Sequence, residues 1–302
     1  DLRRLSNVAK DGSPTSLIGI AQTRALTSFS ARVCGILNAA SVAKKKNLDW
    51  PAYSFEQMEF EAKWSPWTAG RADILISYSK KKSNGRYRTI CNPGPRTRAA
   101  QYSLSEVLDA RGVTSPFDFN GPGLGHHKAV RTVCDWMLEG KFTHFVAFDI
   151  EDAFPSVKPK HVKNFGFTPK QIKSAICFAD NSSPSITIGD RTKMARRGLP
   201  QGAPASAKIF SALLGRELRH LGEDLGIVTF VDDGVIGASS LAEAERVRKA
   251  LPKRLAKMHG GPIGLKRLEI YSAEDGFDFL GYWIQHFPED EENPVRVLPS
   301  HA

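Results

Sequence analysis

Ile227-Val-Thr-Phe-Val-Asp-Asp-Gly-Val-Ile-Gly-Ala238 places two adjacent acids between two apolar runs. Apolar, β-branched runs around a short Asp-Gly turn predict two antiparallel strands joined as a hairpin. Two carboxylates in one tight turn repel each other, which costs stability unless a cation compensates their charge. Asp-Asp-Gly is also ordinary turn chemistry, so this stretch alone leaves both a metal site and a plain turn open.

Two further segments carry unusual residues. Phe142–Phe148 is a strongly apolar run that continues as Phe148-Asp-Ile-Glu-Asp-Ala-Phe154. A carboxylate at the end of a buried strand is costly unless it is paired or binds a metal ion, although a strand-end aspartate can also simply cap a turn. The segment Arg197-Gly-Leu-Pro-Gln-Gly-Ala-Pro-Ala-Ser206 is a loop rich in Gly and Pro that enters an amphipathic helix.

Charge is unevenly distributed along the chain. The 302 residues include 42 Lys and Arg against 32 Asp and Glu, a net charge of +10. Seven basic residues and no acid lie within residues 80–98, and five basic residues and no acid lie within residues 191–208. Basic segments around a few isolated carboxylates suit an enzyme that handles phosphates through divalent ions, whereas each segment alone also fits a solvated loop.

The composition, and the order of the predicted helices and strands, indicate the class of protein and its fold class. Apolar residues make up 41% and charged residues 25% of the chain, and no apolar run approaches the ~18 residues that span a bilayer, so we expect a globular protein with no membrane partner. Four widely spaced cysteines without metal-ligand spacing favour reduced thiols in a cytoplasmic protein. The order of strands and helices predicts an α+β fold with a mainly antiparallel sheet. The individual predictions are a hairpin on Asn84-Gly85 within 72–90, a last strand over 277–284, and helices over 18–37, 55–64, 97–111, 126–139, 168–178, 204–221 and 240–260.

Taken together, the three segments resemble the palm of reverse transcriptases. Asp149 with Phe154 is similar to motif A of that family, residues 198–206 to motif B, and Phe230-Val-Asp-Asp233 to motif C, where Tyr is commoner in the first place. Gly276-Phe-Asp-Phe-Leu-Gly-Tyr282 resembles the primer-grip strand of group II intron and retron enzymes, and the basic hairpin 80–90 resembles the fingers motif. The resemblance covers roughly residues 72–285.

This resemblance implies a domain plan. It predicts right-hand polymerase fingers and palm, with an antiparallel palm sheet and flanking helices. The expected parts are an N-terminal helical extension (1–65), fingers (66–142), palm (143–288, with a fingers insertion at about 157–197) and an acidic tail (289–302). Only 20 residues follow Tyr282, too few for a helical thumb, so we expect the thumb to be absent or truncated.

The resemblance also implies the site residues. Asp149 and Asp232 would be the principal catalytic metal ligands, with Asp233 in support and the carbonyl of Ile150 completing the oxygen shell of Mg²⁺. The expected contacts to the incoming nucleotide are Lys81, Arg88, Phe154, Gln201, Gly202 and Lys266, with Arg267 as the alternative to Lys266. The expected contacts to nucleic acid are Lys80, Lys82, Arg86, Arg96, Arg98, Arg196, Arg197, Gly198, Pro200, Leu280 and Gly281.

The function implied is RNA-templated synthesis of DNA from dNTPs on a primer 3′-hydroxyl. Two Mg²⁺ ions, with Mn²⁺ as the alternative, would serve a two-metal nucleotidyl transfer. The expected partners are an RNA template, a DNA primer or product, a dedicated non-coding RNA and an effector protein, in a retron or related phage-defence system. The alternatives are an untemplated or RNA-synthesising relative and a catalytically silent RNA-binding scaffold. The bulk of Phe154 would crowd a ribose 2′-hydroxyl, and ordinary core packing is the other interpretation of that residue.

Overall fold

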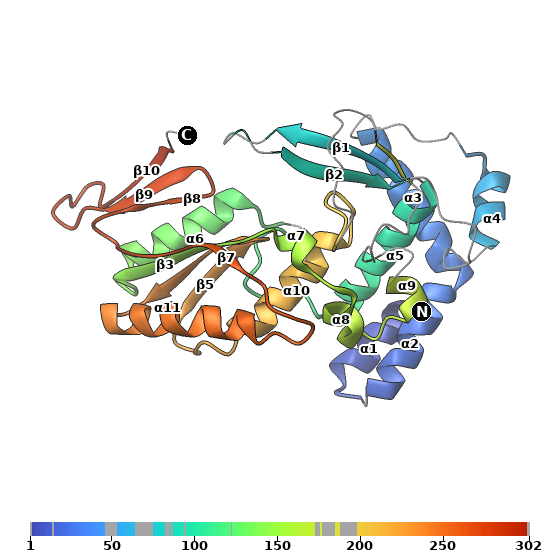
Figure 1. Ribbon diagram of the computed structural model, residues 1–302, viewed down its shortest axis with the longest axis horizontal. Helices are drawn as coiled ribbons and strands as arrows, with labels where there is room; N and C mark the ends of the chain where they lie inside the picture. The colour runs from blue at the N-terminus through green and yellow to red at the C-terminus, as the bar shows by residue number, and fades with distance from the viewer. Residues whose placement is uncertain are drawn as a thin grey trace. The chain divides into compact units, whose positions relative to one another are not determined.

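The computed structural model describes residues 2–13, 15–45, 53–63, 75–81, 85, 87–93, 95–121, 123–172, 176, 185–187 and 198–300 (Figure 1). The chain divides into two compact units, one formed by residues 1–114 and 157–209 and the other by residues 115–156 and 210–302. The predicted α+β class with a mainly antiparallel sheet is confirmed. Among the helices that the structure describes, none has the length and apolar character needed to cross a membrane.

Helices make up most of the first unit. They are α1 (Leu2–Lys10), α2 (Thr15–Thr27), α3 (Phe29–Lys45), α4 (Phe55–Lys63), α5 (Pro95–Ala110), α8 (Pro159–Val162), the 3₁₀ helix η1 (Lys163–Phe165), α9 (Pro169–Gln171) and the start of α10 (Ser206–Leu218). Of the helix predicted over 168–178, the described part is α9, which Thr168 caps by accepting the Gln171 amide at 3.2 Å. The prediction of one helix over 18–37 is wrong, because the side chain of Ser28 accepts the Ala31 amide at 3.2 Å and begins α3 after α2 has ended.

The long helices α3 and α5 pack closely. Gly35 makes this approach feasible, since a Cβ there would lie 2.5 Å from the Ser103 hydroxyl oxygen of α5. Beside the helices, β1 (Leu75–Lys81) and β2 (Tyr87–Pro93) form the predicted antiparallel hairpin, and β4 (Ser185–Thr187) pairs with β1 in parallel. The strand order of this sheet is β2-β1-β4.

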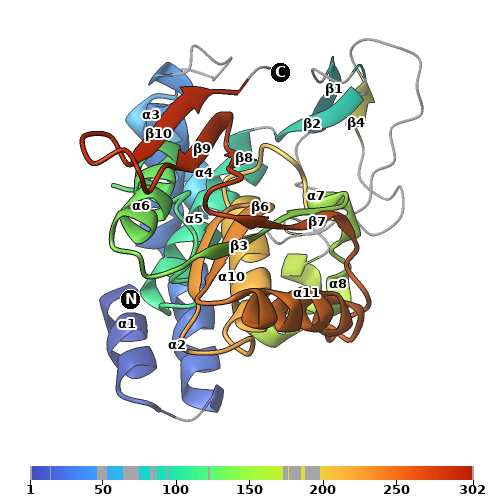
Figure 2. The ribbon, with the colours of Figure 1, turned by 90° about the vertical axis from the view of Figure 1, so that its left-hand side faces the viewer.

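The second unit is built on a four-stranded antiparallel sheet of order β5-β6-β3-β7. Its elements are α6 (His126–Leu138), β3 (His144–Ile150), α7 (Ala153–Ser156), the rest of α10, β5 (Gly226–Phe230), β6 (Asp233–Ala238), α11 (Leu241–Ala256), β7 (Leu265–Ser272), β8 (Phe277–Phe279), β9 (Tyr282–His286) and β10 (Val295–Pro299). Figure 2 shows α11 along one side of this sheet, with the smaller sheet β10-β9-β8 on the other.

Alternation along β3 separates the two faces of the sheet. Phe145 and Ala147 are fully buried in a core that they share with α6, β5, β6 and the β8–β9 hairpin. Asp149 has the same parity, so it continues this face at the point where the strand ends. On the opposite face, the ring of Phe148 covers Gly234 of β6, where a Cβ would lie 2.3 Å from a ring carbon. Asp149 therefore stands at the margin of a tightly packed sheet.

The C-terminal part differs from the prediction. The strand expected over 277–284 is the hairpin β8–β9, because Leu280 (φ 51°) and Gly281 (φ 83°) form a two-residue turn between paired Phe279 and Tyr282. Two central residues of positive φ are the requirement of a type I′ turn. Within the expected acidic tail, β10 pairs with β9, which the sequence did not predict. Pro252 lies inside α11, and the helix continues past this residue to Ala256.

Candidate active site

The structure places Asp149 between two neighbouring strands. In the antiparallel registers it faces Asp233 of β6 on one side and Arg267 of β7 on the other. Directly opposed residues of an antiparallel pair project from the same sheet face, with Cβ atoms roughly 4.5–5.5 Å apart. The side chains of Asp149 and Asp233 are therefore neighbours, although 84 residues separate them in the sequence.

Asp232 lies in the turn between β5 and β6. Since Phe230 pairs with Asp233, Val231 and Asp232 are the two residues of the turn. The Ile150 amide donates to the Asp232 carbonyl at 3.0 Å and so ties the turn to the end of β3. Val231 has φ 61°, a left-handed conformation that costs a β-branched residue on the order of 1–3 kcal/mol. Strain of this kind persists only where the surroundings fix the backbone, and it is typical of functional sites.

Two cations of β7 accompany these carboxylates. The pairing of β3 with β7 shifts register between Asp149 and Ile150, which leaves Lys266 as an extra, bulged residue. The Lys266 ammonium pairs with the Asp149 carboxylate, and the Arg267 guanidinium lies 3.1 Å from an Asp233 carboxylate oxygen. Each cation thus pairs with its own carboxylate. Lys266 and Arg267 therefore both lie at the acidic cluster, which is formed by Asp149, Asp232 and Asp233.

The acidic cluster perturbs the proton affinity of Asp233. Burial raises the pKa of Asp233 to about 6, and the negative charges of Asp149 and Asp232 act in the same direction. The Arg267 charge and hydrogen bond oppose the rise. Asp149 and Asp232 therefore both lie close enough to Asp233 for their charges to act on it.

The raised pKa makes folding stability depend on pH. Protonated Asp233 favours the folded state below the ordinary aspartate pKa near 4, and this contribution is lost as pH rises through about 6. Without divalent ions, we expect the free energy of unfolding of the wild type to fall between pH 4 and 7 relative to that of Asp233→Asn, by up to about 3 kcal/mol. Denaturant titrations of both proteins across this range measure the difference. Parallel pH profiles would contradict the prediction.

The donor atoms of Asp149, Asp232 and Asp233 determine which ion they could bind. Among the described residues, no group of three or more His, Cys, Asp or Glu side chains is arranged so that it could hold a metal ion. The available donors are carboxylate oxygens, which are the ligands that Mg²⁺ prefers, and they already attract the cationic groups of Lys266 and Arg267. The residues therefore fit a divalent ion that would compete with these two ion pairs.

The predicted nucleotide residues of the first unit lie on β1, on β2 and in the loop before α10. The loop before α10 packs on β2, where the Gln201 carbonyl accepts the Cys91 amide at 2.7 Å. At Gly202 (φ 104°) a Cβ would lie 2.9 Å from the Cys91 carbonyl oxygen, so the glycine serves a close approach inside the protein itself. In the same loop, Gly198 and Pro200 are buried. Lys81 ends β1 and is exposed.

The remaining predicted basic residues have varied positions. Arg96 makes two hydrogen bonds to the carboxylate of Glu61, at 2.6 and 2.7 Å, and Arg98 is only 7% exposed. For Lys80 and Arg88 the structure describes only the backbone, in which the two residues pair across the β1–β2 hairpin. Outside the described residues lie Lys82, Arg86, Arg196 and Arg197.

Aromatic side chains gather beside the β5–β6 turn, and the sequence did not predict the two histidines among them, His126 and His127. His126 and His127, which open α6, have ring centroids 3.9 Å apart, and the His126 ring stacks on Tyr282 of β9 at 6.5 Å. His126 also meets Phe230 edge to face at 6.4 Å. Because three distant segments contribute, only the adjacent histidines after a Gly-rich loop offered a signal in the sequence.

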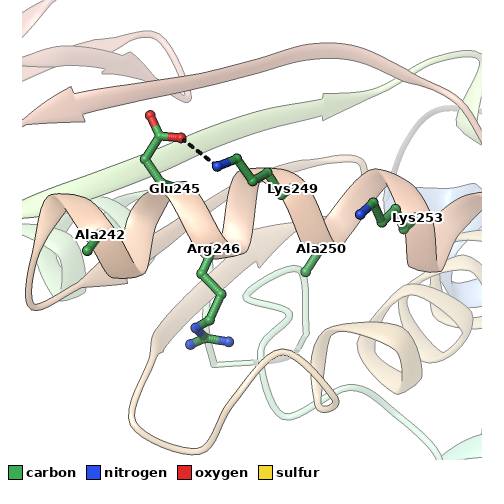
Figure 3. Close-up of a pocket in the computed structure, with 6 residues that line it drawn as sticks. All are labelled: Ala242, Glu245, Arg246, Lys249, Ala250 and Lys253. Carbon is green, nitrogen blue, oxygen red and sulfur yellow. Dashed lines mark ion pairs between the residues drawn. The ribbon is translucent and has the colours of Figure 1, made fainter.

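A shallow hollow of about 460 Å³ lies along one face of α11 (Figure 3). Its lining is Ala242, Glu245, Arg246, Lys249, Ala250 and Lys253. Glu245 and Lys249 form an ion pair at 3.7 Å, while Arg246 donates to the Leu221 carbonyl at 2.7 Å. None of the predicted catalytic residues lines this hollow.

Comparison with known proteins identifies the family. The model of the family described as "Reverse transcriptase (RNA-dependent DNA polymerase)" matches residues 79–284. The "Retron Mx162 reverse transcriptase" of Myxococcus xanthus is 28% identical over 176 residues, which are 54% of this chain and 35% of that protein. The chain thus spans about a third of the length of this curated relative.

Two of the solved structures that align with this chain are telomerases. Apo telomerase from Candida tropicalis, truncated from its C-terminal domain, aligns with a TM-score of 0.48 and 13% identity over 74% of this chain and 55% of that chain. Telomerase from Candida albicans in complex with a fragment of telomeric RNA aligns with a TM-score of 0.45 and 11% identity over 71% and 44%. The family match covers more than half of the sequence and includes all three aspartates of the acidic cluster. The chain therefore belongs to the reverse transcriptase family.

Proposed function

We propose that this protein catalyses RNA-templated synthesis of DNA, with Asp149, Asp232 and Asp233 as the catalytic carboxylates. The observation that carries the proposal is the pairing of Asp149 with Asp233 across β3 and β6, with Asp232 in the adjoining turn that the Ile150 amide ties to the end of β3. The membership in the reverse transcriptase family supports the same reaction. We correspondingly assign the fingers to the first unit and the palm to the second.

In the proposed reaction, the primer 3′-hydroxyl gives its proton to solvent water and its oxygen attacks the α-phosphate of a dNTP. A bond forms between the 3′-oxygen and the α-phosphorus, the bond to the β-phosphate oxygen breaks, and pyrophosphate leaves. Two divalent ions, Mg²⁺ or Mn²⁺, would supply positive charge to the attacking and leaving oxygens. The three aspartates and the Ile150 carbonyl would hold these ions, since all of them provide oxygen donors.

Basic and small residues would position the nucleotide. Lys266 and Arg267, freed from their carboxylates when cations bind, would face the phosphates that leave. Lys81 and Arg88 would pair with the β- and γ-phosphates, and Gln201 and Gly202 would lie under the nascent base pair. Leu280 and Gly281 form the β8–β9 turn, which we assign to the primer strand on the basis of the family resemblance.

The biological setting is a further part of the proposal. The similarity to a retron reverse transcriptase favours action on a dedicated non-coding RNA in the cytoplasm, together with an effector protein in phage defence. Sequencing of the nucleic acid that copurifies with the protein from its host tests this setting. A single structured RNA with attached DNA is the expected result, and an unselected mixture of cellular RNA would contradict it.

Primer extension tests the activity. We expect the purified protein to extend a DNA primer on an RNA template with dNTPs in Mg²⁺ or Mn²⁺, and to stop when EDTA is added. Extension without a template would support an untemplated transferase, and extension with NTPs alone would support an RNA-synthesising relative. Tight RNA binding without any incorporation would support a silent scaffold and overturn the proposal.

A further inference from the structure

The segment before α6 lies directly against β5 of the β5–β6 hairpin. The Thr229 amide of β5 donates to the Phe117 carbonyl at 2.7 Å, and the Phe119 amide donates to the Thr229 carbonyl at 2.8 Å. Asp118 and Thr229 form an isolated parallel bridge between these bonds. The backbone around Asp118 is therefore fixed beside the last residues of β5, next to the turn that contains Asp232.

The Asp118 side chain holds the turn itself. Its Oδ1 atom accepts the Val231 amide at 3.2 Å and the Asn120 amide at 3.2 Å. One carboxylate oxygen thus links the bridged segment to the first residue of the turn. Hydrogen bonds to an ionised acceptor are stronger than those between neutral groups. Asp118 lies 113 residues from Val231 in the sequence and belongs to none of the three segments that carry the family motifs.

The residue that Asp118 holds is the strained one. At φ 61°, Val231 occupies a conformation that glycine adopts freely and valine avoids. The same backbone carries Asp232 as the next residue, so a relaxation of Val231 toward negative φ would turn the Asp232 carboxylate away. An external hydrogen bond to the Val231 amide counteracts that relaxation.

We propose that Asp118 is a positioning residue that keeps Val231 in its left-handed conformation and thereby aims the Asp232 carboxylate at the divalent-ion site. This inference rests on the proposed function for its kinetic effect, but the hydrogen bond from Val231 to Asp118 is independent of it. Asp118 itself contacts no reacting group in this proposal. Its role is to hold the backbone of Val231 at positive φ, which this residue would otherwise leave for a negative φ.

A double-mutant cycle tests the proposal. Asp118→Ala removes the acceptor, and we expect about a tenfold lower kcat for nucleotide incorporation and a several-fold higher Mn²⁺ concentration for half-saturation. Asp118→Asn keeps an Oδ1 acceptor and is expected to stay within about threefold of wild type. Val231→Gly in the Asp118→Ala background is expected to recover most of the loss, because glycine adopts positive φ without strain. Effects of Asp118→Ala that are equal in the wild-type and Val231→Gly backgrounds would overturn the proposal.

The control is Asp275→Ala. Asp275 also accepts local hydrogen bonds in the second unit, from the Ser272 hydroxyl at 2.7 Å, but it does not touch the turn, so kinetics and Mn²⁺ affinity are expected to be unchanged. If Asp118→Ala does not fold, Asp118→Glu replaces it, since one added methylene displaces the carboxylate and keeps its charge. Wild-type affinity for Mn²⁺ in that variant would also overturn the proposal.

A second readout separates this inference from the proposed function. Calorimetric titration with Mn²⁺ alone needs neither template nor nucleotide. A wild type that binds Mn²⁺ but incorporates no nucleotide would refute the proposed function, while weaker binding by Asp118→Ala and its recovery by Val231→Gly would still support the positioning role. Equal Mn²⁺ affinity in all variants would refute the positioning role even if the wild type is an active polymerase.

Discussion

Asp232→Asn is expected to lower the rate of nucleotide incorporation by about 10³-fold or more. The substitution keeps the size of the side chain and the turn, but it removes one of the negative charges that would bind the divalent ions. Such ions supply several kcal/mol of transition-state stabilisation, and about 4 kcal/mol corresponds to a factor of 10³. Single-nucleotide extension of a DNA primer on an RNA template under single-turnover conditions measures the loss.

Although Asp232→Asn lowers the incorporation rate, it should not lower the stability of the folded protein. The Asp232 charge is among those that raise the pKa of Asp233, so its removal relieves repulsion within the acidic cluster. We expect Asp232→Asn to unfold at an equal or higher temperature than the wild type when divalent ions are absent. A loss of activity that is accompanied by gained stability is typical of a site whose charges serve function rather than folding.

The matched control for this substitution is Glu245→Gln on α11. Glu245 belongs to the same unit and pairs with Arg248 at 3.2 Å and with Lys249 at 3.7 Å, so the change also removes one charge from an ion-paired acid. We expect incorporation within about twofold of wild type, because exposed ion pairs contribute little. Undiminished Mg²⁺-dependent incorporation by Asp232→Asn would exclude the proposed mechanism.

Local sequence patterns were sufficient for the elements that carry the acidic cluster. The apolar run that ends at Phe148 and the two apolar runs on either side of Asp232 and Asp233 predicted β3 and the β5–β6 hairpin, and the structure extends β3 through Asp149 to Ile150. The Asn84-Gly85 signal likewise predicted the pairing of β1 with β2. The β1–β2 and β5–β6 hairpins each pair residues that lie close together in the sequence, whereas β3 was indicated by its apolar composition alone.

Interactions between distant segments could not be predicted from the sequence. The short strand β10 (Val-Arg-Val-Leu-Pro) forms where β9 offers an edge to pair with, and a run of five residues does not by itself reveal such a partner. The bulge that brings Lys266 to Asp149 depends on the register between β3 and β7. Asp118 was missed for the same reason, because its significance comes only from the Val231 amide that the fold brings to it. Sequence motifs identified the acids, while the residues that position them emerge from tertiary structure.

Phe154→Ala is expected to relax the selection of deoxynucleotides over ribonucleotides. Phe154 lies on α7, five residues after Asp149, and its half-buried ring lies 5.9 Å from the buried ring of Phe210 on α10. In the family that this chain belongs to, a bulky residue at this place would crowd the ribose 2′-hydroxyl. Steric discrimination of one small group is worth about 1–3 kcal/mol, so we expect the ratio of kcat/KM for dNTP over NTP to fall by roughly 10- to 100-fold.

Two further variants separate this steric role from packing against Phe210. Phe154→Tyr keeps the bulk of the ring and is expected to keep the dNTP preference. Phe210→Leu loosens the same aromatic contact from the other side, so it should lower the unfolding temperature and leave the preference intact, because the ring of Phe154 still stands in place. If Phe154→Ala lowers the unfolding temperature as Phe210→Leu does and the kcat/KM ratio stays at the wild-type value, Phe154 is a packing residue, and the selection of the sugar must come from another side chain.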